Sequence, residues 1–244
     1  MNGHRQVGRD SKRTILPIPD GVIFDMDGVL IDSHSVHRSA WRRFLASVGK
    51  DVGDEQLDYI LEGRRREEIL RYFLGDLSPE TLMEYGQQKG HFFQEKLEEV
   101  RLIPGVRAFL RVLEVAGIKT GIATSASSYR TWKTLEVLDL NKFEFVITGD
   151  DVPNGKPDPT VYIRSCQAMT LPAEKLLVLE DAPCGVQAAK AAGIRCVGVS
   201  SNGRAVALRN AGADYIISDF RDLSIEKLSA LWHAITSNGM VSMF

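Results

Sequence analysis

The run from Val22 to Leu30, with the sequence VIFDMDGVL, constrains the fold of this chain more than any other segment. Its first residues are β-branched and aromatic, which is typical of a strand buried on both faces of a parallel sheet. Two carboxylates, Asp25 and Asp27, come directly after them, with Gly28 behind. An acid before glycine also occurs in ordinary tight turns, so the motif alone favours chemistry only slightly. Because ligands of open α/β sheets bind at the carboxyl ends of strands, its meaning depends on the side chains at the ends of the other strands.

Apolar runs typical of buried strands alternate with amphipathic helical stretches along most of the chain. We expect strands at Gly21–Asp25, Ile118–Thr124, Phe143–Ile147, Leu176–Glu180, Ile194–Val199 and Tyr215–Ile217. We expect helices between them at Val106–Ala116, Tyr129–Leu138, Thr160–Ala168, Val186–Ala192 and Arg204–Ala211. This alternation predicts an α/β fold built on a doubly wound, Rossmann-like parallel sheet.

One interval breaks the alternation. Between His34 and about Val100 the sequence has helical patterns and no convincing strand, with helices expected at Ser35–Val48, Asp54–Leu61, Arg66–Leu74 and Pro79–Val100. A helical block inserted after the first strand predicts a second, smaller domain, so residues 34–100 are expected to form an all-helical cap. The core then comprises residues 19–33 and 101–244. Its hinges are expected near Ile31–Ser33 and Arg101–Gly105, where a Pro-Gly pair marks a break.

The charge balance narrows the range of partners. The formal net charge of −2 gives no electrostatic reason to expect nucleic acid or an anionic membrane as a partner. No apolar run approaches the roughly 18 residues of a membrane span. A few basic residues near the amino end are too few to bind nucleic acid tightly, so residues 1–18 are expected to be a flexible arm.

The number and spacing of the cysteines indicate the redox environment of the protein. Cys166, Cys184 and Cys196 lie far apart, with no Cys-x-x-Cys pair and an odd count. This pattern fits a reducing cytoplasm better than a disulfide framework or a zinc site, so a cytoplasmic protein is expected. The helical block has no obvious heptad seam, which favours a monomer.

Polar groups lie at the ends of four of the expected strands or just beyond them. They are Asp25 with Asp27, Thr124 with Ser125, Lys156 in a Gly-Lys-Pro-Asp-Pro segment, and Glu180 with Asp181. Each group has an ordinary explanation, because hydroxyls cap helices, lysines are usually solvated and acid pairs form turns. The coincidence of all four at one sheet edge is far less probable than any single one of these explanations.

Together these side chains suit phosphoryl transfer. Carboxylates on two strands can hold Mg²⁺, a hard cation that prefers a few carboxylates together with water and substrate phosphate. A lysine and a hydroxyl can neutralise and hydrogen-bond the phosphate oxygens. One carboxylate can attack phosphorus to form an aspartyl phosphate, while a neighbour moves the proton of the leaving group.

At these residues the chain resembles the haloacid dehalogenase-like superfamily, in its phosphatase and phosphomutase branch with a helical cap. The resemblance runs from about Gly21 to about Ser218, and its motifs are highly specific in combination. It implies that Asp25 is the nucleophile and Asp27 the general acid and base. Dehalogenases and phosphonate-cleaving relatives generally lack an acid at the position of Asp27, so the family name does not decide the substrate.

The same resemblance implies the binding roles. It assigns the transferring phosphoryl group to Thr124, Ser125 and Lys156. It assigns Mg²⁺ to Asp25, Asp181 and the backbone carbonyl of Asp27, with Glu180 assisting.

Within the superfamily, the cap resembles that of the β-phosphoglucomutase-like branch. Asp32-Ser33, His37 and Trp41 match its cap hinge, and the segment from Glu62 to Glu68 looks like its substrate-recognition loop. This likeness implies that Arg66, His37 and Gly63 face the substrate. Two ordinary alternatives stay open. The arginines at 64–66 could be a solvated helix start paired with nearby acids, and His37 with Trp41 could simply pack the cap.

We therefore expect a Mg²⁺-dependent phosphatase that acts on a small phosphorylated metabolite, a sugar phosphate in particular. The first alternative is a β-phosphoglucomutase-like phosphomutase, which uses the same chemistry. Glu62 stands where those mutases generally have a lysine, and an acid beside a second phosphate is repulsive, which favours the phosphatase. The second alternative, an inactive binding or regulatory module, is disfavoured because the full set of chemical side chains is intact.

Overall fold

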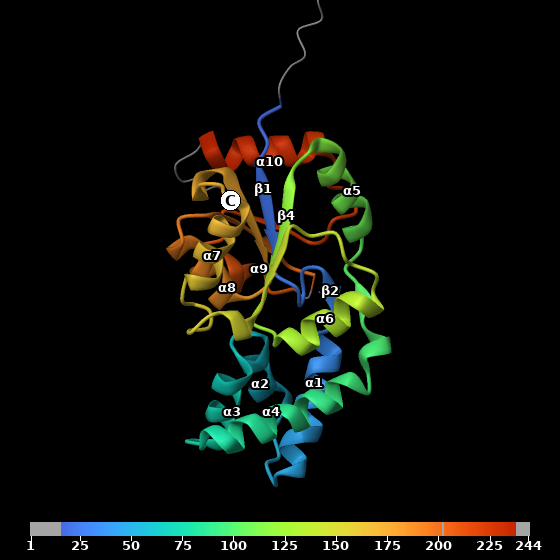
Figure 1. The fold of residues 1–244 in the computed structure, drawn as a ribbon, viewed down its shortest axis with the longest axis vertical. Coiled ribbons are helices and arrows are strands. Elements are labelled where there is room, and N and C mark those ends of the chain that lie inside the picture. The colour runs from blue at the N-terminus through green and yellow to red at the C-terminus, as the bar shows by residue number, and fades with distance from the viewer. Residues whose placement is uncertain (1–15, 202, 238–244) are drawn as a thin grey trace, which may run out of the picture.

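Six parallel strands form the central sheet of the structure, a computed structural model that describes residues 16–201 and 203–237 (Figure 1). They are β1 (Gly21–Phe24), β4 (Lys119–Ala123), β5 (Phe145–Ile147), β6 (Leu176–Glu180), β7 (Arg195–Val199) and β8 (Tyr215–Ile217). The order across the sheet is β5-β4-β1-β6-β7-β8, and all neighbours run parallel. Each strand predicted from the sequence is confirmed, and the predicted fold class is correct.

Helices cover both faces of this sheet. They are α5 (Val106–Ala116), α6 (Ser128–Val137), α7 (Thr160–Met169), α8 (Pro183–Ala191), α9 (Ala205–Asn210) and α10 (Ile225–Ser237). In Figure 1, α7 and α8 lie on one side of the sheet and α5 on the other, while α10 crosses the end farthest from the cap. The sequence patterns predicted all of these helices except α10.

The apolar residues of β1 explain why this strand lies at the centre of the sheet. Val22 and Phe24 belong to the hydrophobic cluster under α5 and α10, whereas Ile23 belongs to the cluster under α7 and α8. All three are fully buried. Each such side chain contributes about 1.5–3 kcal/mol when it leaves water, so neither face of β1 tolerates a polar residue. The two carboxylates come only where the strand ends.

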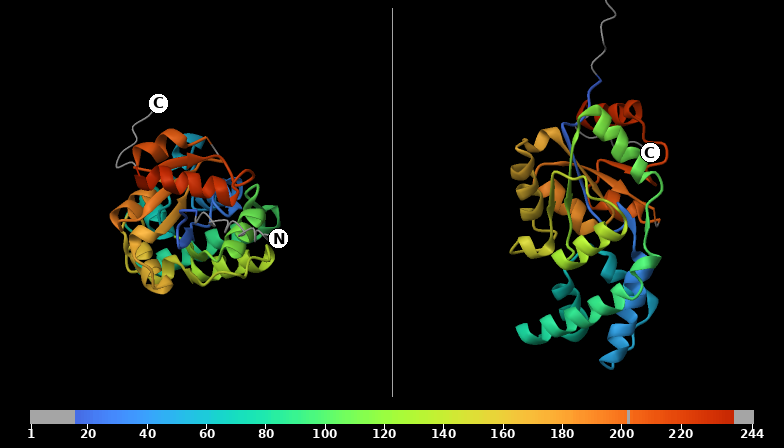
Figure 2. Two further views of the ribbon diagram at one scale, coloured as in Figure 1. Left: turned by 90° about the horizontal axis from the view of Figure 1, so that it is seen from above. Right: turned by 45° about the vertical axis from the view of Figure 1, so that its right-hand side comes forward.

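The cap contains α1 (His34–Ser47), α2 (Asp54–Leu57), α3 (Arg66–Leu74) and α4 (Pro79–Gln94), and lies below the core in Figure 1 and in the right-hand view of Figure 2. It has a hydrophobic cluster of its own, centred on Trp41, Phe44 and Leu70. Two helix predictions need correction. The stretch predicted as one helix over residues 54–61 becomes a 3₁₀ turn after Leu57, and the last cap helix ends at Gln94 rather than Val100. Val100 is buried in the hydrophobic cluster of the core, so the chain must leave the helix to reach it.

The two segments expected to be hinges pair with each other. β2 (Ile31–Asp32) and β3 (Arg101–Leu102) form a two-stranded antiparallel ribbon, which the sequence patterns did not predict. The ribbon joins the cap to the core through two adjacent strands. The boundaries of the two domains stay a prediction, and residues 1–15 of the expected arm lie outside the described residues. Within the described ranges, no helix has the length and apolar character needed to cross a membrane.

Candidate active site

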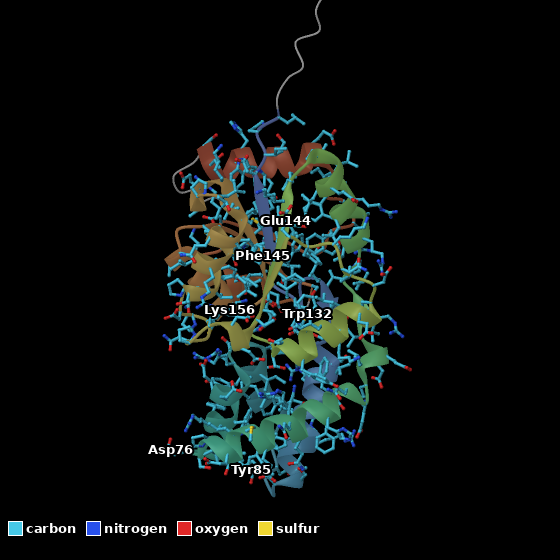
Figure 3. The ribbon with its side chains drawn as sticks, viewed as in Figure 1. Asp76, Tyr85, Trp132, Glu144, Phe145 and Lys156 are labelled. Carbon is cyan, nitrogen blue, oxygen red and sulfur yellow. The ribbon has the colours of Figure 1, made fainter. Side chains whose placement is uncertain are left out.

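A cavity of about 1110 Å³ lies where the carboxyl ends of the strands face the cap. The core lines it with Asp25, Asp27, Thr124, Ser125 and Asp181, and the cap lines it with Gly63, Arg66, His37 and Trp41. Lys156 and Glu180 are buried directly behind Asp25, and Figure 3 shows Lys156 at the end of the core nearest the cap. The structure thus brings the predicted phosphate-binding, metal and catalytic residues of the core to one place, opposite Arg66, His37 and Gly63 of the cap.

Lys156 is fixed by three acceptors at the floor of this site. Its ammonium donates to Asp25 Oδ1 at 2.6 Å, Glu180 Oε1 at 2.5 Å and the carbonyl of Ala123 at 3.1 Å. These contacts use all three of its protons. Burial on its own would lower the pKa of Lys156, but the carboxylates of Asp25 and Glu180 raise it above the usual value. The lysine therefore stays charged and immobile beside the expected nucleophile.

Glu180 is fully engaged inside the protein. Besides Lys156, its carboxylate accepts from the Tyr162 hydroxyl at 2.8 Å and from the backbone N–H groups of Asp181 at 3.0 Å and Ala182 at 3.1 Å. The first turn of α8 packs tightly on it, because a Cβ at Gly185 would overlap the Glu180 carboxylate. This geometry favours a role for Glu180 in orienting Lys156 and Asp181. Such a role agrees with the assisting part in metal binding that the resemblance implies.

Three buried carboxylates suit a hard cation. Ligand atoms of Asp25, Glu180 and Asp181 all lie within 4.8 Å of one another. Burial, reinforced by the other carboxylates, raises the pKa of both Asp25 and Asp181, although Lys156 opposes this at Asp25 and His34 at Asp181. An all-oxygen donor set that is costly to ionise without a cation fits Mg²⁺. Since Glu180 already has partners for both oxygens, Asp25 and Asp181 are the carboxylates that would hold the ion.

Asp27 has a different environment, made mainly by Arg130 from α6. The guanidinium donates to Oδ1 at 2.9 Å and to Oδ2 at 2.5 Å, and the Ser33 hydroxyl donates to Oδ1 at 2.6 Å. Burial would raise the pKa of Asp27, but Arg130 and His37 bring it well below the usual range. Asp27 is therefore held in its ionised form in this arrangement.

His37 and Lys89 continue this contact into the cap. His37 Nε2 lies 3.2 Å from Asp27 Oδ1, and His37 Nδ1 lies 3.0 Å from Lys89 Nζ. Burial, with Lys89 nearby, lowers the pKa of His37 to about 3, and burial lowers that of Lys89 well below its usual value. His37 thus contacts the chemical site, whereas Trp41 packs into the cap cluster.

Neither Lys89 nor Arg130 was singled out from the sequence, although the position of Lys89 on its helix indicates burial. Lys89 follows Leu82 by seven residues and precedes Phe93 by four, so it lies on the apolar face of α4. A charged residue on such a face is unusual and points to a buried partner. Arg130 occupies the first turn of α6 with no pattern that separates it from a surface arginine.

The two hydroxyl residues after β4 differ in their contacts. Thr124 is buried, and its hydroxyl accepts from the backbone N–H of Ala126 at 3.1 Å. Ser125 donates across the cavity edge to the carbonyl of Gly63 at 2.7 Å. Gly63 has a φ of +82°, and a Cβ there would lie 2.8 Å from Ala182 Cβ, so the cap loop needs glycine at this contact.

The three cap arginines make separate contacts. Arg65 donates to backbone carbonyls of the core, among them that of Pro153 at 2.9 Å, and so holds the cap against the core. Arg64 pairs with Glu68 at 3.2 Å, as the solvated-helix alternative anticipates, but it also lines the cavity. Arg66 lies across α4, with Nη1 3.3 Å from the carbonyl of Gly86. It pairs with Glu67 at 3.1 Å, as the same alternative anticipates, but it also lines the cavity.

Glu62 contacts Arg204 of the core rather than the cavity. Glu62 Oε1 lies 2.5 Å from Arg204 Nη2, and Arg204 also donates to the carbonyl of Leu61. This ion pair offsets the negative charge that was expected beside a second phosphate. Glu62 therefore does not separate a phosphatase from a phosphomutase, and it acts instead as a contact between cap and core.

Comparison with known proteins agrees with this geometry. Residues 22–199 match the model of the haloacid dehalogenase-like hydrolase family. The chain is 36% identical over 216 residues to a phosphorylated carbohydrates phosphatase from Thermotoga maritima, covering 85% of this chain and 98% of the relative. It is 29% identical over 261 residues to a β-phosphoglucomutase from Mycobacterium tuberculosis, covering 91% and 99%.

A solved structure extends the likeness to the whole fold. The β-phosphoglucomutase from Clostridium difficile superimposes with a TM-score of 0.81 at 23% identity, covering 91% of this chain and 100% of the other. The family match spans most of the chain, including the four groups at the sheet edge. The chain therefore belongs to the haloacid dehalogenase-like hydrolases, in the branch that includes sugar phosphatases and β-phosphoglucomutases.

Proposed function

We propose that this enzyme is a Mg²⁺-dependent phosphatase that hydrolyses a phosphorylated sugar through an aspartyl phosphate on Asp25. The observation that carries the proposal is the buried ammonium of Lys156, held 2.6 Å from Asp25 Oδ1 behind the floor of a cap-covered cavity. A fixed positive charge there favours the negative charge that develops on a transferring phosphoryl group. The 36% identity to a phosphatase of phosphorylated carbohydrates supports the substrate class.

In the first step, a carboxylate oxygen of Asp25 forms a bond to phosphorus while the bond from phosphorus to the sugar oxygen breaks. In this proposal Thr124 and Ser125 bind the phosphoryl oxygens, and Lys156, whose three protons are engaged by its present acceptors, supplies positive charge from behind Asp25. The departing sugar oxygen takes a proton from Asp27, which must first carry one and turn from Arg130 towards the substrate. Mg²⁺, when bound by Asp25 and Asp181, would neutralise phosphate charge.

In the second step, water attacks the aspartyl phosphate and inorganic phosphate leaves, which regenerates the Asp25 carboxylate. Asp27 now acts as a base and takes the proton of the water. The contacts of Asp27 with Arg130 and His37 lower its pKa, which supplies the ionised form that this step requires but weakens it as a base, so Asp27 has to leave them before it takes the proton. The cap excludes bulk water during the first step, as lids of this kind do, and has to move before product leaves.

Removal of the metal should stop turnover. We expect EDTA to abolish phosphate release and added Mg²⁺ to restore it, because the buried carboxylates would otherwise repel the substrate phosphate. Phosphate release is measured before and after chelation, with Ca²⁺ as a second cation that matches the charge but not the preferred geometry. Full activity of metal-free protein would contradict the proposal.

Arg66 should contribute recognition rather than chemistry. The Arg66→Ala variant is expected to lose about tenfold or more in kcat/KM for a sugar phosphate and much less for p-nitrophenyl phosphate, because only the sugar reaches the cap. Arg71→Ala, on the same helix, removes an arginine that does not line the cavity and serves as the matched control. Equal losses on both substrates would place Arg66 in the core site or in folding.

A screen decides between the phosphatase and the phosphomutase. Purified enzyme with Mg²⁺ is incubated with a panel of phosphorylated sugars, and both inorganic phosphate and isomerised sugar phosphate are measured. We expect phosphate as the main product. Conversion of β-glucose 1-phosphate to glucose 6-phosphate, primed by the bisphosphate and much faster than phosphate release, would show that a sugar hydroxyl replaces water as the acceptor.

A further inference from the structure

The cavity is larger than one monosaccharide phosphate needs. Its volume of about 1110 Å³ exceeds the range of about 300–1000 Å³ that holds a drug-sized ligand. A phosphate bound over Asp25 places the attached sugar beneath the cap. Residues of α6 in the core and of α4 in the cap also line the cavity, and these two helices lie next to each other in Figure 1. Arg130 of α6 lies 5.1 Å from the centre of the Phe93 ring of α4, so the two helices meet at this side of the cavity.

On the α6 side, one exposed aromatic residue lines this space and a second lies one turn farther along the helix. Tyr129 lines the cavity yet is 61% exposed, and Trp132, one turn farther along α6, is 55% exposed. Figure 3 shows Trp132 at the junction of core and cap. In the described part of the chain, neither ring stacks on another aromatic ring. A large apolar surface left in water beside a polar-lined cavity is a feature of ligand-binding sites, and a tyrosine offers both a flat apolar face and a hydroxyl.

The α4 side offers open space and hydrogen-bonding groups. Gly90 lines the cavity, and a Cβ built at this position would have no atom within 4 Å among its described neighbours. Glycine inside a helix is less favourable than alanine, and here no packing contact requires it. Gln94, one turn farther, also lines the cavity and carries an amide that can donate to and accept from hydroxyls.

We propose that Tyr129, Gly90 and Gln94 form an outer sugar subsite, so that the preferred substrates are phosphorylated disaccharides or glycosides rather than free monosaccharide phosphates. This inference rests on the proposed phosphatase function and specifies its substrate class. The Tyr129 ring stacks on the apolar face of the second sugar ring. The absent side chain at Gly90 leaves room for that ring, and the Gln94 amide binds its hydroxyls.

The test compares substrates that differ only by the second ring. Phosphate release is measured from glucose 6-phosphate and from trehalose 6-phosphate, sucrose 6-phosphate and maltose 6′-phosphate. We expect kcat/KM to be at least tenfold higher for the best disaccharide phosphate. Tyr129→Ala and Gly90→Leu should each remove most of this preference by lowering the disaccharide value, whereas Tyr129→Phe, which keeps the ring, should retain it. Tyr215→Ala removes another half-exposed tyrosine, on an edge strand outside the cavity, and is the matched control.

A binding measurement separates recognition from turnover. Tryptophan fluorescence of the Asp25→Asn variant is titrated with the same sugar phosphates, and Trp132→Phe shows which part of the signal comes from α6. Tighter binding of the disaccharide phosphate, lost on Tyr129→Ala, supports the subsite. The subsite is refuted if kcat/KM for glucose 6-phosphate equals or exceeds that for every disaccharide phosphate. It is also refuted if Tyr129→Ala lowers kcat/KM for all the sugar phosphates by the same factor. No phosphate release from any sugar phosphate would instead refute the proposed phosphatase function.

Discussion

Replacement of Asp25 by asparagine is expected to reduce turnover about 10³-fold or more while the protein stays folded. Asparagine keeps the shape of the side chain but removes the negative charge of the proposed nucleophile and one of the two carboxylates proposed to hold Mg²⁺. Lys156 retains Glu180 as a charged partner at 2.5 Å, so the buried lysine is not left unpaired. Phosphate release gives the activity, and circular dichroism with a thermal melt gives the state of the fold.

A neighbouring acid provides the control for this variant. Asp20 lies just before β1, is exposed, and pairs weakly with Lys175 at 3.7 Å. Asp20→Asn removes the same charge from the same part of the chain and should leave turnover unchanged. Turnover of Asp25→Asn within a few-fold of the wild type would contradict the assignment of the nucleophile.

Replacement of Lys156 by methionine is expected to damage stability and activity together. Methionine fills a similar volume but leaves Asp25 and Glu180 buried without their common cation. Loss of one partner from a buried ion pair costs about 3–5 kcal/mol, which corresponds to a fall in Tm of roughly 6–20 °C for a chain of this size. Phosphate release should be lost as well, because the fixed positive charge beside the proposed nucleophile is gone.

Thermal melts and phosphate release test this variant against a surface lysine. Lys142 pairs with Glu114 at 3.4 Å and is 80% exposed, so Lys142→Met should change Tm and activity little. Lys156→Arg keeps the positive charge, but the guanidinium is too large for a site in which three acceptors match the three protons of an ammonium. We therefore expect this variant to be inactive as well. A Lys156→Met protein with wild-type Tm would refute the buried ion-pair account.

The core of the fold could be predicted because its physical signals are local. The runs around Val22 and Leu176 are short and apolar throughout, which is the pattern of strands buried on both faces. The carboxylates, hydroxyls and lysine beyond these strands then had to meet, because parallel strands end at one edge of a sheet. The end of α4 was mispredicted because burial of Val100 in the core, a long-range contact, overrides local helical preference.

The contacts between cap and core could not be predicted in the same way. Asp27 pairs with Arg130, which is 103 positions away in the sequence. Glu62 pairs with Arg204, which is 142 positions away. Both arginines look like surface residues in the sequence, since nothing local separates a paired guanidinium from a solvated one.

The sequence by itself therefore determined the sheet, the helical insertion and the set of chemical groups at the strand ends. Tertiary structure alone decided which charges are paired. It holds Lys156 charged between two acids, turns Glu62 away from the cavity and leaves the aromatic rings of α6 exposed. The physical reason is the distance along the chain over which each signal acts. Periodicity and chain direction depend on residues that are only a few positions apart. Burial and ion pairing instead depend on which distant segments the fold brings within a few ångströms of each other.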